Sequence, residues 1–290
     1  MKVFNEKDII YLSDNELRKY QFELIKMVKE IFNIFEENDI SYSLSGGSIL
    51  GAIRHQGMIP WDDDIDINIT RSSYNFLVKN FDKLLGDKYY LQSPKSHPEM
   101  GLHVSQIRKK NTIARRKYDI NSEECGISID VYIVENVPNN RLLRFIQTYS
   151  SMALTFAVAS VRETQNYKLL KRIFELEGRK LNYSQGKLLI GWLLKLIPIN
   201  IWLNWLDSCN SLCKDDNSVY VAIPTGRKHF KKETYLRSNM CEYKKAKFED
   251  FECNIPVWSE CYLEMFYGSN YMEIPSKDKH EKHLFLELKY

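Results

Sequence analysis

The sequence contains few of the residues that cross-link a chain or break its regular structure. Among 290 residues there are 12 glycines and 8 prolines, and the six cysteines include no C-x-x-C pair. This excludes the commonest spacing of zinc sites and redox pairs, so we expect reduced and mostly buried thiols. The first ten residues, MKVFNEKDII, lack the apolar run of a signal peptide. We therefore expect a cytoplasmic chain.

The sequence also has no strong excess of charge of either sign. Its net charge is +3, with 27% charged and 44% hydrophobic residues, which is typical of a soluble globular protein. This balance gives no reason to expect a nucleic acid partner. We find no internal repeat and no low-complexity linker, so the length fits one large domain or two smaller ones.

The order of patterns predicts an α+β fold, with a mixed β-sheet core, flanking helices and a helical subdomain. Ser13 and Glu16 form a capping box that begins a helix ending near Glu37. Short strands and helices then alternate as far as Pro138. We place the catalytic core at residues 1–138, the helical subdomain at 139–216, and a β-rich return with a final helix at 217–290.

Two parts of this outline carry further expectations. Helices between 140 and 214 are expected to break near Asn182 and at Pro198. In the last part, residues 243–248 and 251–255 resemble a hairpin, and Gly268 ends a helix over 257–267. The charged tail to Tyr290 is expected to be loosely held.

The densest chemical signal is the acidic run that follows Trp61. Asp62, Asp63 and Asp64 precede a segment in which Ile65, Ile67 and Ile69 alternate with Asp66 and Asn68. Alternation with a period of two predicts a half-buried strand, so Asp64 and Asp66 share the face opposite the isoleucines. Two carboxylates on one strand face are suited to hold Mg²⁺ or Mn²⁺. A solvated acidic loop is the alternative, whereas an EF-hand loop lacks its required glycine here.

A glycine turn lies shortly before this acidic strand. Gly46 and Gly47 let the backbone approach a phosphate group, and Ser48 adds a hydroxyl donor. A brief helix over 49–55 follows, and Arg54 and His55 at its end are further candidates for phosphate or substrate contact.

A second alternating strand supplies a candidate third carboxylate. Ile127, Ile129, Val131 and Ile133 alternate with polar positions that include Asp130. Asp130 could complete a metal site with Asp64 and Asp66, or accept the proton of an attacking hydroxyl.

The run LSGGSILGAIRHQGMIPWDDDIDINI, with GISIDVYIVENVP and YLEMFYGSNYMEIP later in the chain, resembles the LicD family of the nucleotidyltransferase-fold superfamily. That superfamily pairs a glycine turn with a D-x-D strand and a later lone carboxylate. In this chain these features correspond to Gly47-Ser48, Asp64-Ile65-Asp66 and Asp130.

The resemblance implies a phosphotransferase that moves a phospho-alcohol, such as phosphocholine or ribitol phosphate, from a CDP-linked donor to a hydroxyl of a cell-surface glycan or lipid-linked glycan. The nucleotide product would be CMP. A nucleotidyltransferase acting on a small hydroxylated acceptor uses the same carboxylates and stays open, as does a non-catalytic glycan- or nucleotide-binding module.

The most apolar segment is LLIGWLLKLIPINIWLNWL, at 188–206. Lys195 and Pro198 interrupt it, which favours two packed helices of the helical subdomain. The alternative is shallow insertion at a membrane, which would make the enzyme peripheral at the inner membrane face.

Overall fold

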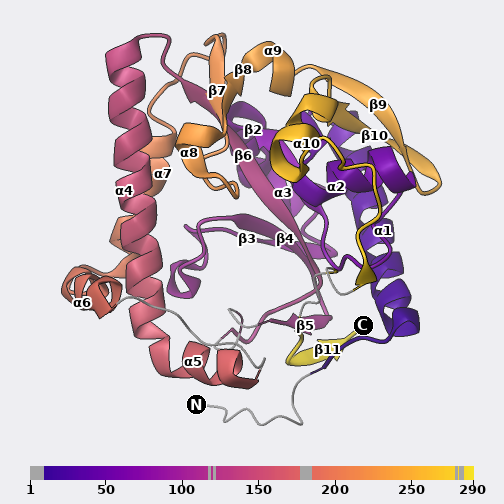
Figure 1. Ribbon diagram of the computed structural model, residues 1–290, viewed down its shortest axis with the longest axis horizontal. Coiled ribbons are helices and arrows are strands. Elements are labelled where there is room, and N and C mark those ends of the chain that lie inside the picture. The colour runs from indigo at the N-terminus through magenta and orange to yellow at the C-terminus, as the bar shows by residue number, and fades with distance from the viewer. Residues whose placement is uncertain (1–9, 117–118, 120–121, 177–184, 278–279, 281–283) are drawn as a thin grey trace.

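The computed structural model describes residues 10–116, 119, 122–176, 185–277, 280 and 284–290. Helices surround a mixed β-sheet (Figure 1), which confirms the predicted α+β class. The break expected near Asn182 lies outside the described residues.

The central sheet has the strand order β1-β2-β6-β4-β3, and only β2 and β6 run parallel among these neighbours. The strands are β1 (Tyr42–Leu44), β2 (Asp66–Thr70), β6 (Ser128–Val137), β4 (Ser105–Lys109) and β3 (Tyr89–Gln92). The far end of β6 pairs with β7 (Tyr220–Ala222), which in turn pairs with β8 (Thr234–Leu236). Segments far apart in the sequence therefore meet on β6.

Two helices cover the apolar face of this sheet. They are α1 (Asp14–Glu37), which has the predicted capping box, and α3 (Arg71–Leu84). Phe32 of α1 stacks on Tyr42 of β1 with ring centroids 4.2 Å apart, and the Tyr74 hydroxyl of α3 lies 2.7 Å from that of Ser105 on β4. The opposite face is left for polar side chains.

The glycine turn leads into ten residues of irregular helix. These are α2 (Gly46–Leu50) and a π-helical segment, η2 (Gly51–His55). The helix predicted over 49–55 therefore begins three residues earlier and changes its winding. π-Helical turns are rare in proteins, and those that occur inside helices often lie at functional sites.

The middle of the chain forms the expected helical subdomain. Its helices are α4 (Arg141–Gln165), α5 (Tyr167–Leu176), α6 (Gln185–Leu194) and α7 (Ile199–Asn210). Pro198 separates α6 from α7, as predicted. A small apolar core lies between α4 and α7, around Val158, Val161 and Leu203.

A buried ion network joins this subdomain to the sheet. Arg71 of α3 donates from Nε to Glu135 of β6 at 2.8 Å and from Nη2 to both Glu135 and Asp207 of α7. Arg71 and Glu135 are almost fully buried. Because Lys95 also pairs with Asp207, two cations face two carboxylates.

The last part of the chain returns to the core. It contains a hairpin of β9 (Tyr243–Phe248) and β10 (Phe251–Pro256), and α10 (Ser259–Tyr267), which ends at Gly268 as predicted. Remaining short elements are η3 (Pro98–Met100), β5 (Ile113–Arg115), α8 (His229–Lys232), α9 (Arg237–Met240) and β11 (Glu287–Lys289). The boundaries at 138 and 216 stay a prediction, although β7 extends the first domain's sheet.

The expectation of a loosely held tail is wrong for residues 284–289. Phe285 is fully buried and its ring lies 5.1 Å from that of Tyr20 in α1. Residues of β11 pair with β5 in antiparallel register. The short apolar run Leu284-Phe285-Leu286 is buried and anchors this segment, and the charged residues around the run hid that long-range contact.

Candidate active site

The three predicted carboxylates gather at the point where β2 and β6 begin to pair. Asp66 lies directly opposite Asp130 in the parallel register, so their side chains are neighbours on one face. The Asp130 amide donates to the Ile65 carbonyl at 3.0 Å, although β2 itself begins only at Asp66. The structure thus brings Asp64, Asp66 and Asp130 together.

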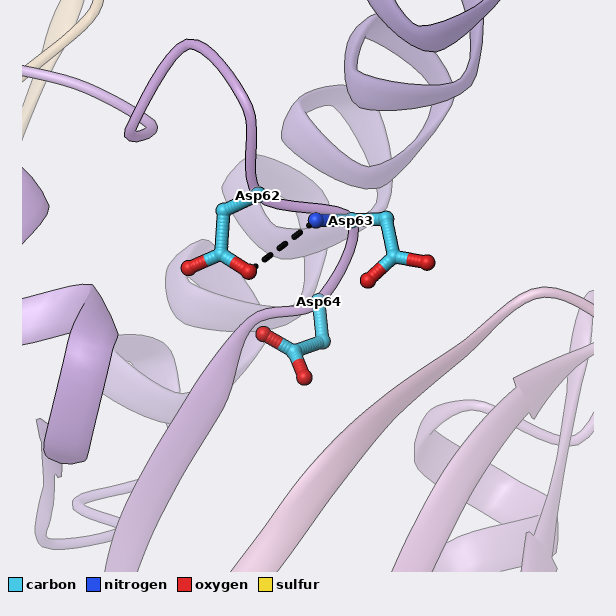
Figure 2. A group of neighbouring side chains, drawn as sticks. All are labelled: Asp62, Asp63 and Asp64. Carbon is cyan, nitrogen blue, oxygen red and sulfur yellow. Dashed lines mark hydrogen bonds between the residues drawn. The ribbon is translucent and has the colours of Figure 1, made fainter. Parts of the chain in front are cut away.

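The acidic run before the strand divides between two sides (Figure 2). The carboxylate of Asp63 points away from those of Asp62 and Asp64, and it pairs with Arg116 at 3.3 Å. One oxygen from each of these three residues lies within 4.8 Å of the others. Asp63, however, is already paired with the guanidinium of Arg116. The side chains free to face a ligand are therefore Asp62 and Asp64.

The glycine turn packs against these acids at close range. A Cβ on Gly46 would lie 3.1 Å from Oδ2 of Asp66, and one on Gly47 would lie 3.3 Å from Oδ2 of Asp62. Ser48 is buried, and its hydroxyl oxygen accepts a hydrogen bond from the Asp66 backbone amide at 2.9 Å. The structure thus gives Ser48 a positioning contact with the acidic strand.

Arg54 and His55 lie elsewhere. The Arg54 guanidinium donates to the carbonyls of Tyr271 and Glu273 at 2.8 and 3.0 Å and to His55 at 2.9 Å. Neither residue lines the acidic cavity. In this structure Arg54 contacts the segment that follows α10, and the His55 ring lies edge-on to Trp61 with ring centroids 5.7 Å apart. A role of either residue in substrate binding stays a prediction.

A cavity of about 460 Å³ opens over the acids, a volume in the range of small-molecule sites. Its acidic wall comes from the first part of the chain, and the opposite wall from the last part. The lining residues include Gly46, Gly47, Asp62, Asp64, Asp66, Tyr132, Thr225, Gly226, Arg227, Glu233, Tyr262 and Tyr267. Arg227 is the one cation among these described lining residues.

Burial and mutual repulsion shape the charges of the site. Burial, then the neighbouring Asp64 and Asp130, raise the pKa of Asp66 well above its ordinary value. Burial and Asp64 raise the pKa of Asp62 in the same direction. Burial also raises the pKa of Asp130, although the amide of Gln106, which donates at 2.6 Å, opposes that shift. This excess of negative charge is what a divalent cation would offset.

Asp62, Arg227 and Tyr267 are among the lining residues of this cavity that were not predicted as site residues. Asp62 could have been found, because the alternation that pairs Asp64 with Asp66 places Asp62 on the same side. Arg227 had no local signal, and Tyr267 had only its place in the run YLEMFYGSNYMEIP. Both reach the cavity through folding of distant segments. Burial and the negative charge of Asp66 raise the pKa of Tyr267 to about 12, so its hydroxyl keeps its proton.

Gly46 provides a test of the close packing in this turn. Its φ of +49° lies in the left-handed region, where a side chain costs about 1–2 kcal/mol. Gly46→Ala is expected to lower the free energy of unfolding by about that amount and to displace Asp66. Chemical denaturation measures the loss, with Gly186→Ala as control, since a Cβ there meets nothing within 4 Å. A loss no greater than in Gly186→Ala would contradict the expectation.

A pH series tests the charge of Asp66. A carboxyl whose pKa is raised by folding stabilises the folded state below its unfolded pKa of about 3.9 and loses that advantage as pH rises through the folded pKa. Without divalent cations, the variant Asp66→Asn should therefore match wild type near pH 3.5 and become progressively more stable than wild type towards pH 8. Asp250→Asn is the control of opposite sign, because a hydrogen bond from Lys29 lowers the pKa of Asp250. A constant difference between Asp66→Asn and wild type over this range would contradict the assignment.

Comparisons with known proteins agree with this arrangement. Residues 39–141 match the LicD/FKTN/FKRP nucleotidyltransferase domain, and this range includes the glycine turn and the aspartates from Asp62 to Asp130. Residues 39–141 are thus similar to the nucleotidyltransferase domain of the LicD family.

Individual relatives fall in the same group. A lipopolysaccharide cholinephosphotransferase LicD of Haemophilus influenzae is 29% identical over 42% of this chain and 46% of its own length. An uncharacterised protein of Rickettsia prowazekii is 29% identical over 50% of this chain and 46% of its own length. The human ribitol 5-phosphate transferase FKRP is 41% identical over 16% of this chain and 9% of its own length. The chain spans about half the length of the first two relatives.

Proposed function

We propose that this protein is a divalent-metal-dependent phosphotransferase that moves a phospho-alcohol from a CDP-linked donor to a glycan hydroxyl and releases CMP. The observation that carries the proposal is the convergence of Asp62, Asp64 and Asp66 on one cavity beside a glycine turn, with Asp130 next to Asp66. The similarity to glycan-directed phosphotransferases supports the acceptor class.

The residues present fit Mg²⁺ or Mn²⁺. Asp64 and Asp66 would hold the cation, with Asp62 and Asp130 as the neighbouring carboxylates, because hard cations of this size prefer oxygen ligands. A bound cation would supply charge neutralisation at the donor's diphosphate. The raised pKa values of Asp62 and Asp66 favour this fit, since both carboxylates are costly to ionise without a counter-charge.

The other polar groups of the cavity are placed to bind a diphosphate. The amides at the start of α2 have no acceptor within the helix, and Gly46 and Gly47 leave room for phosphate oxygens there. Arg227 lies across the cavity and can donate to the same oxygens. Together, these amides and Arg227 would orient the donor and hold its CMP part in place.

In the reaction, a hydroxyl oxygen of the glycan forms a bond to the phosphorus distal to cytidine. The bond between that phosphorus and the oxygen of CMP breaks, and CMP leaves with that oxygen. The hydroxyl proton passes to a carboxylate of the site. We assign this role to Asp130, since its raised pKa suits proton acceptance and Gln106 fixes its Oδ1.

Product analysis tests the function. The chain is incubated with CDP-choline, CDP-ribitol or CTP, a glycan acceptor, and Mg²⁺ or Mn²⁺. The proposal predicts CMP from a CDP-alcohol only when metal and acceptor are present. Pyrophosphate from CTP would instead show a nucleotidyltransferase. Donor binding with neither product, under conditions in which a relative turns over, would show a binding module.

A further inference from the structure

The helical subdomain carries an apolar surface that nothing in the described structure covers. On α4 the outer residues Leu142, Phe145, Ile146, Tyr149 and Phe156 are exposed, and they are spaced by three, four or seven residues along the helix. Such spacing places them in one stripe along the helix. In Figure 1 this helix forms one side of the molecule, opposite α1.

In the first half of the same helix, the inner side that packs on the protein is polar. Gln147, Ser151 and Thr155 are buried, and Gln147 donates to the carbonyls of Cys209 and Asn210 at the end of α7. A helix on the surface of a protein in water normally has the reverse arrangement. The first half of α4 therefore presents its apolar side outward.

Helix α6 extends this surface. Gly191 packs directly on α4, because a Cβ there would lie 2.1 Å from Thr164 Oγ1 and 2.4 Å from the Ser160 carbonyl. The exposed residues Leu189, Ile190, Trp192, Leu193 and Leu196 occupy the rest of the helix circumference and the turn after it. Leu189 is 63% and Leu196 77% exposed. The sequence predicted α6 as a packed helix, and only the side that faces α4 is packed.

We propose that this surface, formed by the outer sides of α4 and α6, docks on a lipid bilayer with anionic headgroups. A protein partner usually covers one side of a helix, whereas α6 is apolar on every side that does not face α4. Among the described residues no single helix is long and apolar enough to cross a membrane, but α6 and α7, bent by 96°, together have the length and composition of a broken span. Shallow insertion fits these dimensions.

The charges at the surface favour anionic lipid. Lys195 lies 5.5 Å from the ring of Trp192, and Lys231 lies 5.6 Å from the ring of Tyr149. Aromatic rings beside lysines are typical of the headgroup region, where the rings bury their apolar part and the ammonium groups meet phosphate.

The surface is connected to the acidic cavity by a single short segment. Lys231 belongs to α8 and follows the cavity residue Arg227 by four positions. Four residues span at most about 14 Å, so docking would hold this wall of the cavity close to the bilayer. If the proposed function is correct, the acceptor hydroxyl would be reached on a glycan attached to lipid.

Vesicle flotation of the full chain tests the docking. The expected result is flotation with phosphatidylcholine vesicles containing phosphatidylglycerol. Leu189→Glu/Leu193→Glu and Phe145→Glu/Tyr149→Glu should each weaken binding at least about tenfold. The control Phe22→Glu alters a residue of α1 that is 55% exposed and should bind as wild type does. Lys195→Glu/Lys231→Glu should lose binding to anionic vesicles.

Two results would overturn the proposal. One is a monodisperse wild-type chain that does not float with vesicles containing phosphatidylglycerol. The other is a wild-type dimer that the same glutamate substitutions dissociate without vesicle binding, which would assign the surface to a second copy. The variant Asp64→Asn should float like wild type, so failure of the proposed chemistry and failure of docking are distinguished.

Discussion

Replacing Asp66 by asparagine is expected to reduce CMP release at least about a thousandfold, because one cation ligand is lost where negative charge develops in the reaction. Asp64→Asn should have an effect of similar size. Both variants should remain folded, since asparagine has nearly the same shape as aspartate. Steady-state assays of CMP formation, with circular dichroism for the fold, measure the two effects.

The controls separate chemistry from charge. Asp250→Asn removes an exposed carboxylate on the β9–β10 hairpin and should leave turnover unchanged. Raising the Mn²⁺ concentration should recover part of the activity of Asp64→Asn if metal affinity is what it lost. Turnover within tenfold of wild type in both site variants would remove the metal assignment.

Removing Glu135 should destabilise the protein by about 3–5 kcal/mol, because Glu135→Ala leaves the guanidinium of Arg71 buried without its main partner. Arg71 and Glu135 are 7% and 1% exposed. The loss should appear as a lower denaturation midpoint. Unfolding is expected to begin where α7 meets the sheet, because Arg71 also holds Asp207.

Two comparisons make this prediction specific. Asp250→Ala breaks the exposed pair with Lys29 and should shift the denaturation midpoint much less than Glu135→Ala does. The double variant Arg71→Met/Glu135→Leu should recover much of the loss, because it removes both buried charges. A loss below about 1 kcal/mol for Glu135→Ala would show that the network contributes little.

Local sequence patterns were sufficient for much of the fold and for the acidic centre. The capping box of Ser13 and Glu16 predicted α1, and the alternation of Ile65, Ile67 and Ile69 placed two aspartates on one face. The turn at Gly46 was also predicted. These features depend on neighbouring residues only, so a period or a cap reveals them.

What the sequence did not reveal depends on contacts between distant segments. Arg227 and Tyr267 line the cavity, and Phe285 anchors the tail on α1, through folding of the last part of the chain. Arg54 was expected near phosphate, yet it holds the carbonyls of Tyr271 and Glu273. The outward apolar side of α4 was missed because periodicity shows that a helix has an apolar stripe, but not which way the stripe faces.

The central claim is that the acidic cavity holds a divalent cation for phosphoryl transfer, and anomalous diffraction from crystals soaked in Mn²⁺ tests it most directly. The account predicts a manganese peak within about 2.5 Å of carboxylate oxygens of Asp64 and Asp66, which strengthens with a CDP-alcohol and is lost in Asp66→Asn. A fully occupied manganese ion elsewhere, with no peak between these two side chains, would contradict it.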